Sequence, residues 1–273
     1  QVHAHSYYPP YLIRNSEEVA LPGNNGGRQG QTYSHYQIIE AARQFIRDNA
    51  DGPFFCYLPI TPPHGMFDIP EQDPAWQQFK DQPWPQDARR YAAMVSMVDR
   101  QVGEIIELLK ELELDQKTLV IFCGDNGGQN YFRSKKAPRG FHGPNVNPRT
   151  SVEFRGQKGT LYEGGLRIPM IAHWPKGIAA RNELRRTAAH AIDVVPTVLE
   201  LAGIDARHEV PSPGRSLVRT FRQDGRALHN NLWWLHEGNR ALRAGDWKLV
   251  ATKDEPWELF NLAKDRTETR NLA

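Results

Sequence analysis

Three groups of side chains that could do chemistry lie at the ends of apolar runs in the sequence. His64 follows the first run, in PITPPHGMF, and Asp125 and Asn126 follow the second, in LVIFCGDNGG. Lys158 lies between glycines in GQKGTLYEGGLRIP, just before a third run. Ligands of open parallel sheets bind beyond the carboxyl ends of the strands. The sequence therefore offers an imidazole, two oxygen ligands and a lysine for one site.

Each group also has an ordinary structural explanation. Residues 125–128 and 163–165 are rich in the residue types that form tight turns. A lone Lys or His is more often a solvent-facing side chain than a functional group. Their joint occurrence favours a site for a tetrahedral oxyanion ester, in which a cation on Asp125 and Asn126 polarises the ester oxygens. Lys158 would supply a fixed positive charge, and His64 would donate a proton to the leaving group.

The elements that must position these groups alternate between helix and strand. Helical spacing of apolar residues predicts helices over 32–49 and 87–114, and apolar runs predict buried strands at 54–59, 118–123 and 167–174. Because strand, helix and strand follow one another twice, the sequence predicts an α/β fold. We expect a mainly parallel sheet flanked by helices.

The last third of the sequence predicts a helix and then a small sheet. In DVVPTVLELAG, Asp193 is a suitable N-cap, Pro196 falls in the first turn, and Gly203 ends the helix. The segment RALRAGDWKLVATKDEPWELFNL alternates strand-like runs with turns, which predicts a small antiparallel sheet. We therefore expect an α/β catalytic domain over 1–207 and a C-terminal subdomain over 208–273.

Composition narrows the function class without naming it. The 34 basic and 32 acidic residues give a net charge of +2, which predicts no general attraction to nucleic acid or membrane. The sequence has no apolar run of the length that a membrane span needs. Its two cysteines, Cys56 and Cys123, lie inside apolar runs and are expected to be buried free thiols.

Five segments resemble the successive motifs of type I sulfatases, which belong to the alkaline-phosphatase-like superfamily. The segments are PPHGMF, CGDNGG, KGTLYEGGLRIPMIAHWPKG, IDVVPTVLELAG and RALRAGDWKLV with ELFNLAKDRTETRNLA, in the family's order. This resemblance implies hydrolysis of sulfate esters at a Ca²⁺ site. By motif match Asp125 and Asn126 would be calcium ligands and Lys158 would contact the sulfate and its bridging oxygen. His64 would stand by the leaving group.

The sequence departs from the family pattern at the nucleophile. Family members carry, nearer the N-terminus, a paired acidic metal site and a Cys- or Ser-x-Pro-x-Arg motif whose first residue becomes formylglycine. Cys56 is followed by Tyr-Leu-Pro and Cys123 by Gly-Asp-Asn, so neither fits the motif. We therefore expect the incomplete, C-terminal part of a sulfatase, with no nucleophile in this chain and no turnover by itself. Such a part would leave a sheet edge uncovered and would tend to aggregate.

Positive charge gathers between two of the candidate elements. From Gln129 to Lys158 the sequence has a single acid, Glu153, and seven basic residues: Arg133, Lys135, Lys136, Arg139, Arg149, Arg155 and Lys158. A solvated loop is the ordinary explanation of such a run. Its position favours the steering of an anionic substrate such as a sulfated glycan. We therefore count Arg133, Lys135 and Lys136 among the substrate-binding candidates.

Two alternatives stay open beside the sulfatase hypothesis. One is a phosphodiesterase or phosphonate hydrolase of the same superfamily, although no second His and Asp cluster suggests its transition metals. The other is a truncated binding or scaffold module without catalysis. For a sulfatase the expected partner is a glycan or small-molecule sulfate ester, such as an aryl sulfate. A secreted, periplasmic or lysosomal location is expected from the resemblance alone, and the oligomeric state is left open.

Overall fold

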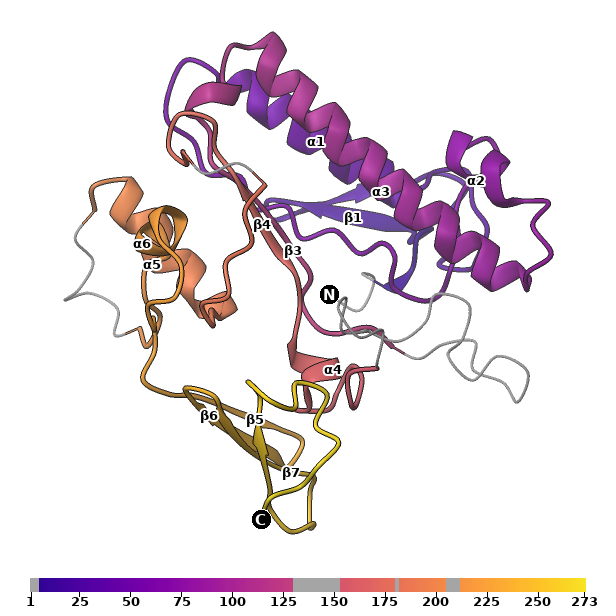
Figure 1. Cartoon of the computed structure of the whole chain (residues 1–273). Helices are drawn as coiled ribbons and strands as arrows, with labels where there is room; N and C mark the ends of the chain where they lie inside the picture. Colours follow the sequence, from indigo (N-terminus) through magenta and orange to yellow (C-terminus); the bar gives the residue numbers. More distant parts are fainter. Residues whose placement is uncertain (1–4, 130–152, 180–181, 205–211) are drawn as a thin grey trace. The chain divides into compact units, whose positions relative to one another are not determined.

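The computed structural model describes residues 5–129, 153–179, 182–204 and 212–273, and Figure 1 traces them from the indigo to the yellow end. The chain folds as two compact units, Gln1–Thr118 and Leu119–Ala273. The boundary predicted after residue 207 lies outside the described residues and stays a prediction.

The first unit contains a β-hairpin followed by helices. In chain order its elements are β1 (Tyr11–Arg14), β2 (Glu17–Ala20), α1 (Ser34–Asp48), α2 (Pro74–Phe79), α3 (Gln86–Glu111) and the 3₁₀-helix η2 (Asp115–Lys117). β1 and β2 pair antiparallel, with Tyr11 opposite Ala20. The two helices predicted for this part of the chain are confirmed as α1 and α3.

Apolar residues at helical spacing bury one face of each long helix. The buried apolar residues of the two helices are Ile39, Ala42 and Ile46 in α1, and Ala88, Ala93, Met94, Met97, Val98, Leu108 and Leu109 in α3. A buried polar contact joins the two helices, because His35 Nε2 lies 2.6 Å from Gln101 Oε1. α2 is joined to α3 through its N-cap Asp73, whose carboxylate pairs with Arg100.

The strand predicted at residues 54–59 is not formed, so that prediction is wrong. Exposure alternates along this segment, and the outward side chains of Phe55 and Tyr57 are 62% and 76% exposed. This two-residue period is the one a strand has. No backbone ladder joins the segment to any other described residue, and an apolar run needs a hydrogen-bonding neighbour to become a strand.

The second unit carries the remaining helices and strands. Its elements are β3 (Val120–Cys123), α4 (Glu163–Leu166), β4 (Met170–His173), η3 (Ala191–Asp193), α5 (Val194–Leu201), α6 (Val218–Arg222), β5 (Leu232–His236), β6 (Asn239–Ala244), β7 (Trp247–Ala251) and β8 (Glu258–Asn261). β3 and β4 confirm two of the predicted strands. One side of this strand pair packs with a core of Ile178, Leu217 and Phe221.

The expectation of a mainly parallel sheet is wrong for these strands. β3 and β4 pair antiparallel, with Cys123 opposite Met170 and Val120 opposite His173. The reason is the connection: residues 167–169 lead directly from α4 into β4, so β4 begins beside the end of β3 and runs back along it. Every ladder among the described residues is antiparallel.

The thiols are free, as predicted, but they are less buried than predicted. Cys56 is half-buried and Cys123 is exposed. Cys123 is the last residue of β3, and the outward-facing residues Phe122 and Ile171 of the same strand pair are 42% and 60% exposed. An apolar run in the sequence predicts burial only where a second layer covers the strand.

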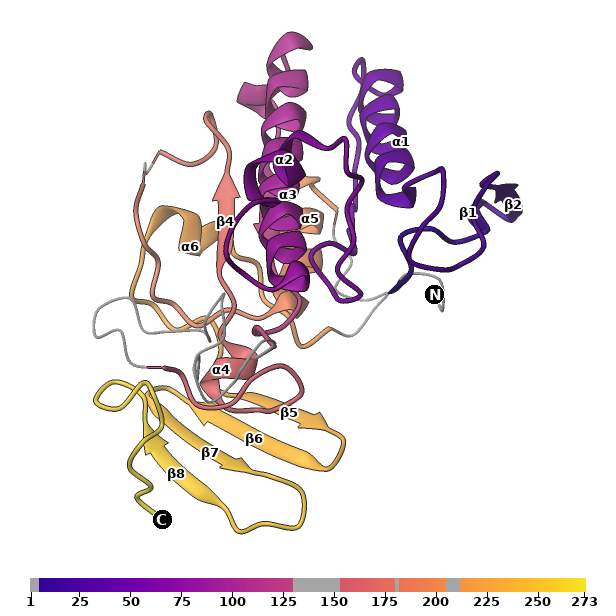
Figure 2. The ribbon, with the colours of Figure 1, turned by 90° about the vertical axis from the view of Figure 1, so that its right-hand side faces the viewer.

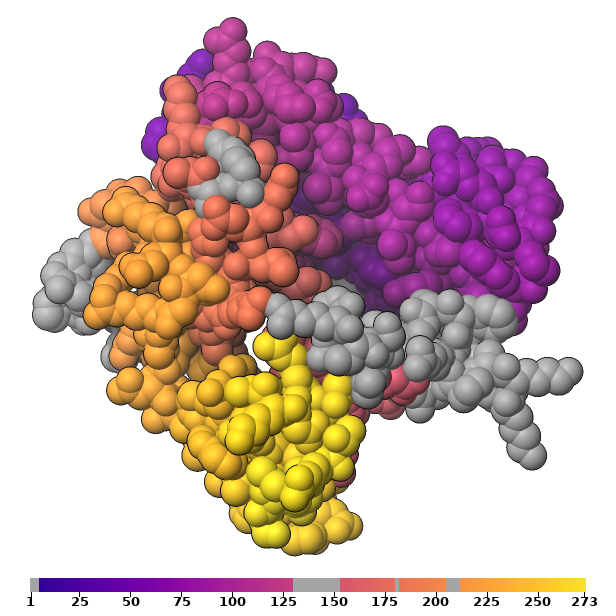
Figure 3. All heavy atoms as spheres, in the orientation of Figure 1, coloured from indigo at the N-terminus to yellow at the C-terminus, as the bar shows by residue number. Residues whose placement is uncertain are grey.

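The predicted C-terminal antiparallel sheet is confirmed. Its strand order is β5-β6-β7-β8, and Figure 2 shows the four strands side by side. One face of the sheet packs against the segment that leads into α4, in a core of Leu161, Tyr162, Ala241, Val250, Phe260 and Leu262. In the space-filling view the yellow C-terminal residues form one packed body (Figure 3).

Asp193 precedes α5 as predicted, but its side chain does not cap that helix. Its carboxylate accepts hydrogen bonds from the backbone amides of His190 (2.8 Å) and Arg215 (2.8 Å), and pairs with His229 Nε2 at 2.8 Å. Asp193 is fully buried, so it ties three chain segments together instead of one helix end. Gly203, with φ of +70°, ends α5 as predicted.

Candidate functional site

Two backbone hydrogen bonds join the segment of Asp125 and Asn126 to the segment of Lys158. The amide of Gly127 donates to the carbonyl oxygen of Gly165 over 2.8 Å, and the amide of Lys158 donates to that of Gly128 over 3.1 Å. These bonds continue the antiparallel approach of β3 and β4 beyond the ends of the ladder. The structure therefore brings two of the three predicted site segments together within the second unit.

Glycines make this junction possible because the backbones touch. A Cβ at Gly127 would lie 1.9 Å from the carbonyl oxygen of Gly164. A Cβ at Gly165 would lie 2.1 Å from the carbonyl oxygen of Thr160 and 2.5 Å from that of Gln157. No real side chain tolerates such contacts with backbone atoms, so any larger residue would push the two segments apart.

Lys158 occupies the corner of a tight turn. The amide of Thr160 donates to the carbonyl oxygen of Gln157 over 3.0 Å, and its hydroxyl donates to the same oxygen over 2.8 Å. Gly159 has φ of +86°, which suits the third position of a type II turn. Lys158 is half-buried at the second position, where the turn fixes the start of its side chain.

Asp125 and Asn126 present oxygen atoms at the end of β3. Asp125 is exposed, and Asn126 is half-buried with Nδ2 donating to the carbonyl oxygen of Gly127 over 2.9 Å. This bond directs the amide nitrogen to the backbone and leaves Oδ1 as the atom for a ligand. A carboxylate and an amide oxygen fit a hard cation, although Ca²⁺ takes six to eight oxygens. No group of three or more His, Cys, Asp or Glu side chains in the described part could hold a metal.

His64 lies in the first unit. Its backbone amide donates to the carbonyl oxygen of Thr61 over 3.0 Å, and its own carbonyl oxygen accepts from Tyr7 Oη over 2.7 Å. The half-buried ring contacts the carbonyl oxygen of Gly65 through Nδ1 and lies 4.5 Å from the ring of His5. The imidazole is therefore held in a structured turn. The steering candidates Arg133, Lys135 and Lys136 lie outside the described residues.

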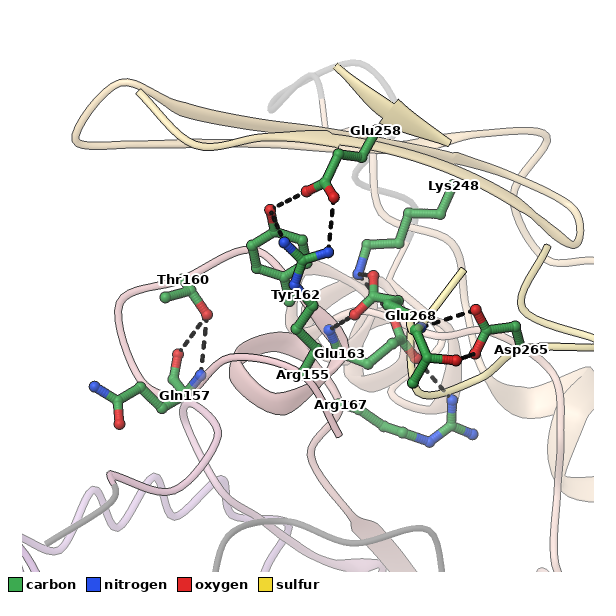
Figure 4. A network of polar contacts seen from close by, with 11 residues as sticks. Arg155, Gln157, Thr160, Tyr162, Glu163, Arg167, Lys248, Glu258, Asp265 and Glu268 are labelled. Atoms are coloured by element: carbon green, nitrogen blue, oxygen red, sulfur yellow. Dashed lines mark hydrogen bonds and ion pairs between the residues drawn. The ribbon is translucent and has the colours of Figure 1, made fainter. Parts of the chain in front are cut away.

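Sequence reasoning missed a buried ion cluster around Glu163 (Figure 4). Lys248 Nζ lies 3.0 Å from Glu163 Oε1 and 2.8 Å from Glu268 Oε1. The second of these is an ion pair without hydrogen-bond geometry. Arg167 Nη1 lies 2.9 Å from Glu163 Oε2. The side chains of Lys248, Glu163 and Glu268 are 1%, 5% and 0% exposed.

The sequence did carry one signal for this cluster. Strand side chains alternate between two faces, so Lys248 shares a face with the apolar residue Val250. That face is the one that packs toward α4, and Val250 is 1% exposed. A lysine on the inner face of a predicted strand requires an acidic partner, but the sequence does not say which of many acids supplies it.

The two carboxylates of the cluster differ in their acidity. Burial alone would raise the pKa of Glu163, but Lys248 and Arg167 outweigh burial and hold that pKa below its usual value. Burial dominates at Glu268 and raises its pKa despite the nearby ammonium of Lys248. Lys248 is thus shared by one carboxyl group whose pKa is lowered and one whose pKa is raised, and of these two it makes a hydrogen bond only to Glu163.

A cavity of about 330 Å³ in the first unit does not belong to this junction. Its lining residues are Asn25, Gly27, Arg28, Gln29 and Arg90. The guanidinium groups of Arg90 and Arg28 lie 3.8 and 4.0 Å from the carboxylates of Asp68 and Asp87, respectively. These paired charges cancel locally, so the cavity has no excess charge for an anion.

Comparison with known proteins identifies the family. The family model described as Sulfatase matches residues 3–204, and the model described as N-sulphoglucosamine sulphohydrolase, C-terminal, matches residues 156–273. The chain belongs to the sulfatase family. This finding confirms the resemblance drawn from the five sequence motifs.

Individual relatives agree with the family assignment. A sulfatase of Formosa agariphila is 30% identical over 306 residues, which cover 97% of this chain and 51% of the relative. Steryl-sulfatase of Homo sapiens is 30% identical over 245 residues, which cover 88% of this chain and 38% of the relative. The chain thus spans about half the length of the first of these relatives and less of the second.

Solved structures support the alkaline-phosphatase-like fold of the sulfatases. The crystal structure of Ps i-CgsB matches with a TM-score of 0.72 and 27% identity, over 96% of this chain and 53% of that one. The phosphonate monoester hydrolase of Agrobacterium radiobacter matches with a TM-score of 0.56 and 21% identity, which shows the shared fold alone. Within the described residues, no helix is long and apolar enough to span a membrane.

Proposed function

We propose that the protein hydrolyses sulfate esters, and that this chain supplies the metal-binding and lysine side of the active site. The observation that carries the proposal is the backbone junction between Gly127 and Gly165. It holds the oxygen ligands at the end of β3 beside the turn of Lys158. A cation and a fixed ammonium on neighbouring turns suit a sulfate group, whose non-bridging oxygens carry the negative charge.

Asp125 and Asn126 would hold Ca²⁺ through a carboxylate oxygen and the amide Oδ1. When bound, the ion supplies positive charge that polarises the ester oxygens. The hydrogen bond from Asn126 Nδ2 to the carbonyl oxygen of Gly127 fixes the direction of the amide. The half-filled ligand set implies that further oxygen ligands complete the site, since Ca²⁺ needs more than two residues.

Lys158 would bind the sulfate and stabilise charge on its bridging oxygen. The turn that carries it is held by the Thr160 hydroxyl and by the bond from the Lys158 amide to the carbonyl oxygen of Gly128. The backbone from which the lysine side chain extends is therefore fixed. His64 would donate the proton that the leaving-group oxygen takes up. The nucleophile, expected as formylglycine from the family, is not assigned to a residue of this chain.

The proposed substrates are sulfated glycans, with aryl sulfates as convenient assay compounds. The structural relative Ps i-CgsB has been solved with k-i-k-neocarrahexaose, an oligosaccharide. The positively charged segment with Arg133, Lys135 and Lys136 would steer such an anion toward the site. Neutralising these three residues should lower kcat/KM at low salt and leave it less sensitive to added salt.

The proposal is tested by calcium binding and hydrolysis in the intact protein. Asp125→Ala should abolish the calorimetric signal of Ca²⁺ binding and the hydrolysis of an aryl sulfate together. Asp246→Ala, at an exposed acid in the turn between β6 and β7, is the matched control and should change neither. Unchanged Ca²⁺ binding in Asp125→Ala would show that residues 125–128 form a tight turn and not the Ca²⁺ site.

The same assay separates the sulfatase from the alternative chemistry. An aryl phosphate diester and an aryl phosphonate should be hydrolysed at least about 100-fold more slowly than the sulfate, as measured by kcat/KM. A preference for the phosphorus compounds would favour the phosphodiesterase or phosphonate hydrolase alternative. Tight binding of a sulfated glycan without any turnover would favour a binding module.

A further inference from the structure

Lys248 is a buried cation that the proposed chemistry does not use. It projects from β7 onto the inner face of the C-terminal sheet, between its cross-strand neighbours Arg243 of β6 and Phe260 of β8. Burying an ammonium group is costly unless its charge is paired, and a well-packed apolar residue would stabilise such a site as well or better. Stability alone therefore does not explain why a lysine occupies this position.

Glu163, the first residue of α4, is held through both its side chain and its main chain. Its carboxylate pairs with Lys248 through Oε1 and with Arg167 through Oε2, while its backbone amide donates to Glu268 Oε2 over 2.6 Å. Both the side chain and the main chain of Glu163 are thus fixed from the C-terminal segments. Figure 4 shows the carboxylates of Glu163 and Glu268 converging on the Lys248 ammonium.

α4 lies directly against the turn that carries Lys158. The position that a Cβ of Gly165 would occupy is filled by the carbonyl oxygens of Gln157 and Thr160, which are the two ends of that turn. The carbonyl oxygen of the same Gly165 accepts the amide of Gly127. A shift of α4 would therefore move the Lys158 turn and the turn of the oxygen ligands at once.

A second set of contacts attaches the loop to the sheet by other means. Tyr162 packs in the apolar core of the sheet and contacts Glu258 through its hydroxyl, and Arg155 pairs with Glu258 at 2.8 Å. The guanidinium of Arg155 also lies 4.1 Å from the centre of the Tyr162 ring. These contacts can keep residues 155–162 on the sheet without Lys248. We therefore assign to the ion cluster the orientation of α4, which these contacts do not fix.

We propose that Lys248 is a positioning residue for the active site: through Glu163 it sets α4, and through α4 it aligns the Lys158 turn with the turn of Asp125 and Asn126. The consequence for catalysis rests on the proposed function of Lys158. Geometric alignment is sensitive, since a displacement of about 1 Å can cost roughly 100-fold in rate.

The test compares Lys248→Met with Lys253→Met in the intact protein. Methionine keeps an unbranched side chain as far as Cε and removes the ammonium group, and Lys253 is an exposed lysine that follows the same strand. In Lys248→Met we expect hydrogen exchange at the amides of Gly127 and Lys158 to speed up at least about tenfold. We also expect kcat to fall roughly 100-fold, with KM changed less. Lys253→Met should match the parent.

A double variant separates positioning from simple charge balance. Lys248→Met with Glu268→Gln removes one charge of each sign and keeps an oxygen acceptor for the amide of Glu163. It should recover the melting temperature lost in the single variant. It should not recover slow exchange at Gly127 and Lys158, nor kcat, because Oε1 of Glu163 still lacks its cation.

The results can overturn this proposal without touching the proposed function. Parent-like exchange at Gly127 and Lys158 in Lys248→Met, with kcat within about twofold, would overturn the positioning role. Recovery of kcat in the double variant would overturn it as well, in favour of a purely structural role. Faster exchange without loss of kcat, together with an active Lys158→Met variant, would instead refute the proposed function of Lys158.

Discussion

The amide of Gly127 donates to the carbonyl oxygen of Gly165 over 2.8 Å, and no side chain larger than hydrogen fits at Gly127. This bond fastens the end of β3 to α4, and with the bond from Lys158 to Gly128 it holds the proposed oxygen ligands beside the turn of Lys158. Two turns that are about thirty residues apart in the sequence thereby act as one unit.

Gly127→Ala should separate the two turns. Its Cβ would lie 1.9 Å from the carbonyl oxygen of Gly164, and a backbone atom cannot move aside as a flexible side chain can. We expect a loss of about 1–3 kcal/mol in the free energy of unfolding and loss of sulfate-ester hydrolysis. Thermal unfolding and an aryl-sulfate assay measure both. Full activity in this variant would show that the junction is not required.

Gly103→Ala is the matched control and should stabilise the protein. Gly103 lies inside α3, and a Cβ there meets no atom within 4 Å. Alanine restricts the unfolded chain and favours the helix by about 0.5–1 kcal/mol. The melting temperature of the first unit should rise by about 2–4 °C, with hydrolysis unchanged. A fall in melting temperature would contradict the open environment of this position.

The sequence predicted those elements whose signal is local. α3 follows from apolar residues at helical spacing, and the C-terminal sheet follows from alternation interrupted by turns. Residues 54–59 have the apolar content of a strand but no ladder to a described neighbour, and pairing is not a local property. The antiparallel course of β4 depends on the short link from α4, which periodicity does not reveal.

In the candidate site, too, some residues follow from local sequence signals and others only from the fold. Asp125, Asn126 and Lys158 stand in motifs whose spacing can be seen in the sequence. The contact of Lys248 with Glu163 joins residues 85 positions apart, and only the fold shows that these two face each other. For Asp193 a local signal was misleading. Its residue type and position predicted a helix cap, but its carboxylate bonds to His229 and to two backbone amides instead.

Asp73→Asn should weaken the first unit in a pH-dependent way. Burial alone would raise the pKa of Asp73, but Arg100, the hydroxyl of Tyr36 and the amide of Ala75 lower it below 3.8. A depressed carboxyl pKa stabilises the fold fully above 3.8, and this stabilisation is lost as the pH falls through the lower folded value.

The expected loss in Asp73→Asn is about 1–2 kcal/mol near pH 7, at the lower end because Arg100 is partly exposed. Urea unfolding between pH 2 and pH 7 measures it, with the exposed Asp81→Asn as control. The difference between Asp73→Asn and the parent should shrink in acid. A difference that stays constant down to pH 2 would contradict the role of the Asp73 charge.

The exposed face of β3 and β4 should drive self-association. Phe122 and Ile171 are cross-strand neighbours, and both strands have unpaired outer edges among the described residues. Ile171→Thr should lower light scattering at a given concentration of this chain. Leu184→Thr, at an isolated side chain that is 85% exposed, should have no such effect. A monodisperse parent sample would contradict this prediction.

The bond between the amide of Glu163 and the carboxylate of Glu268 spans 105 positions. During synthesis the Lys158 turn leaves the ribosome well before the residue that fixes α4. Because closing a long loop costs more entropy than closing a short one, we expect the bond from Glu163 to Glu268 to form later than the local contacts of the Lys158 turn. A nascent chain that stalls before Glu268 would carry every catalytic residue proposed here and still lack the support that aligns them.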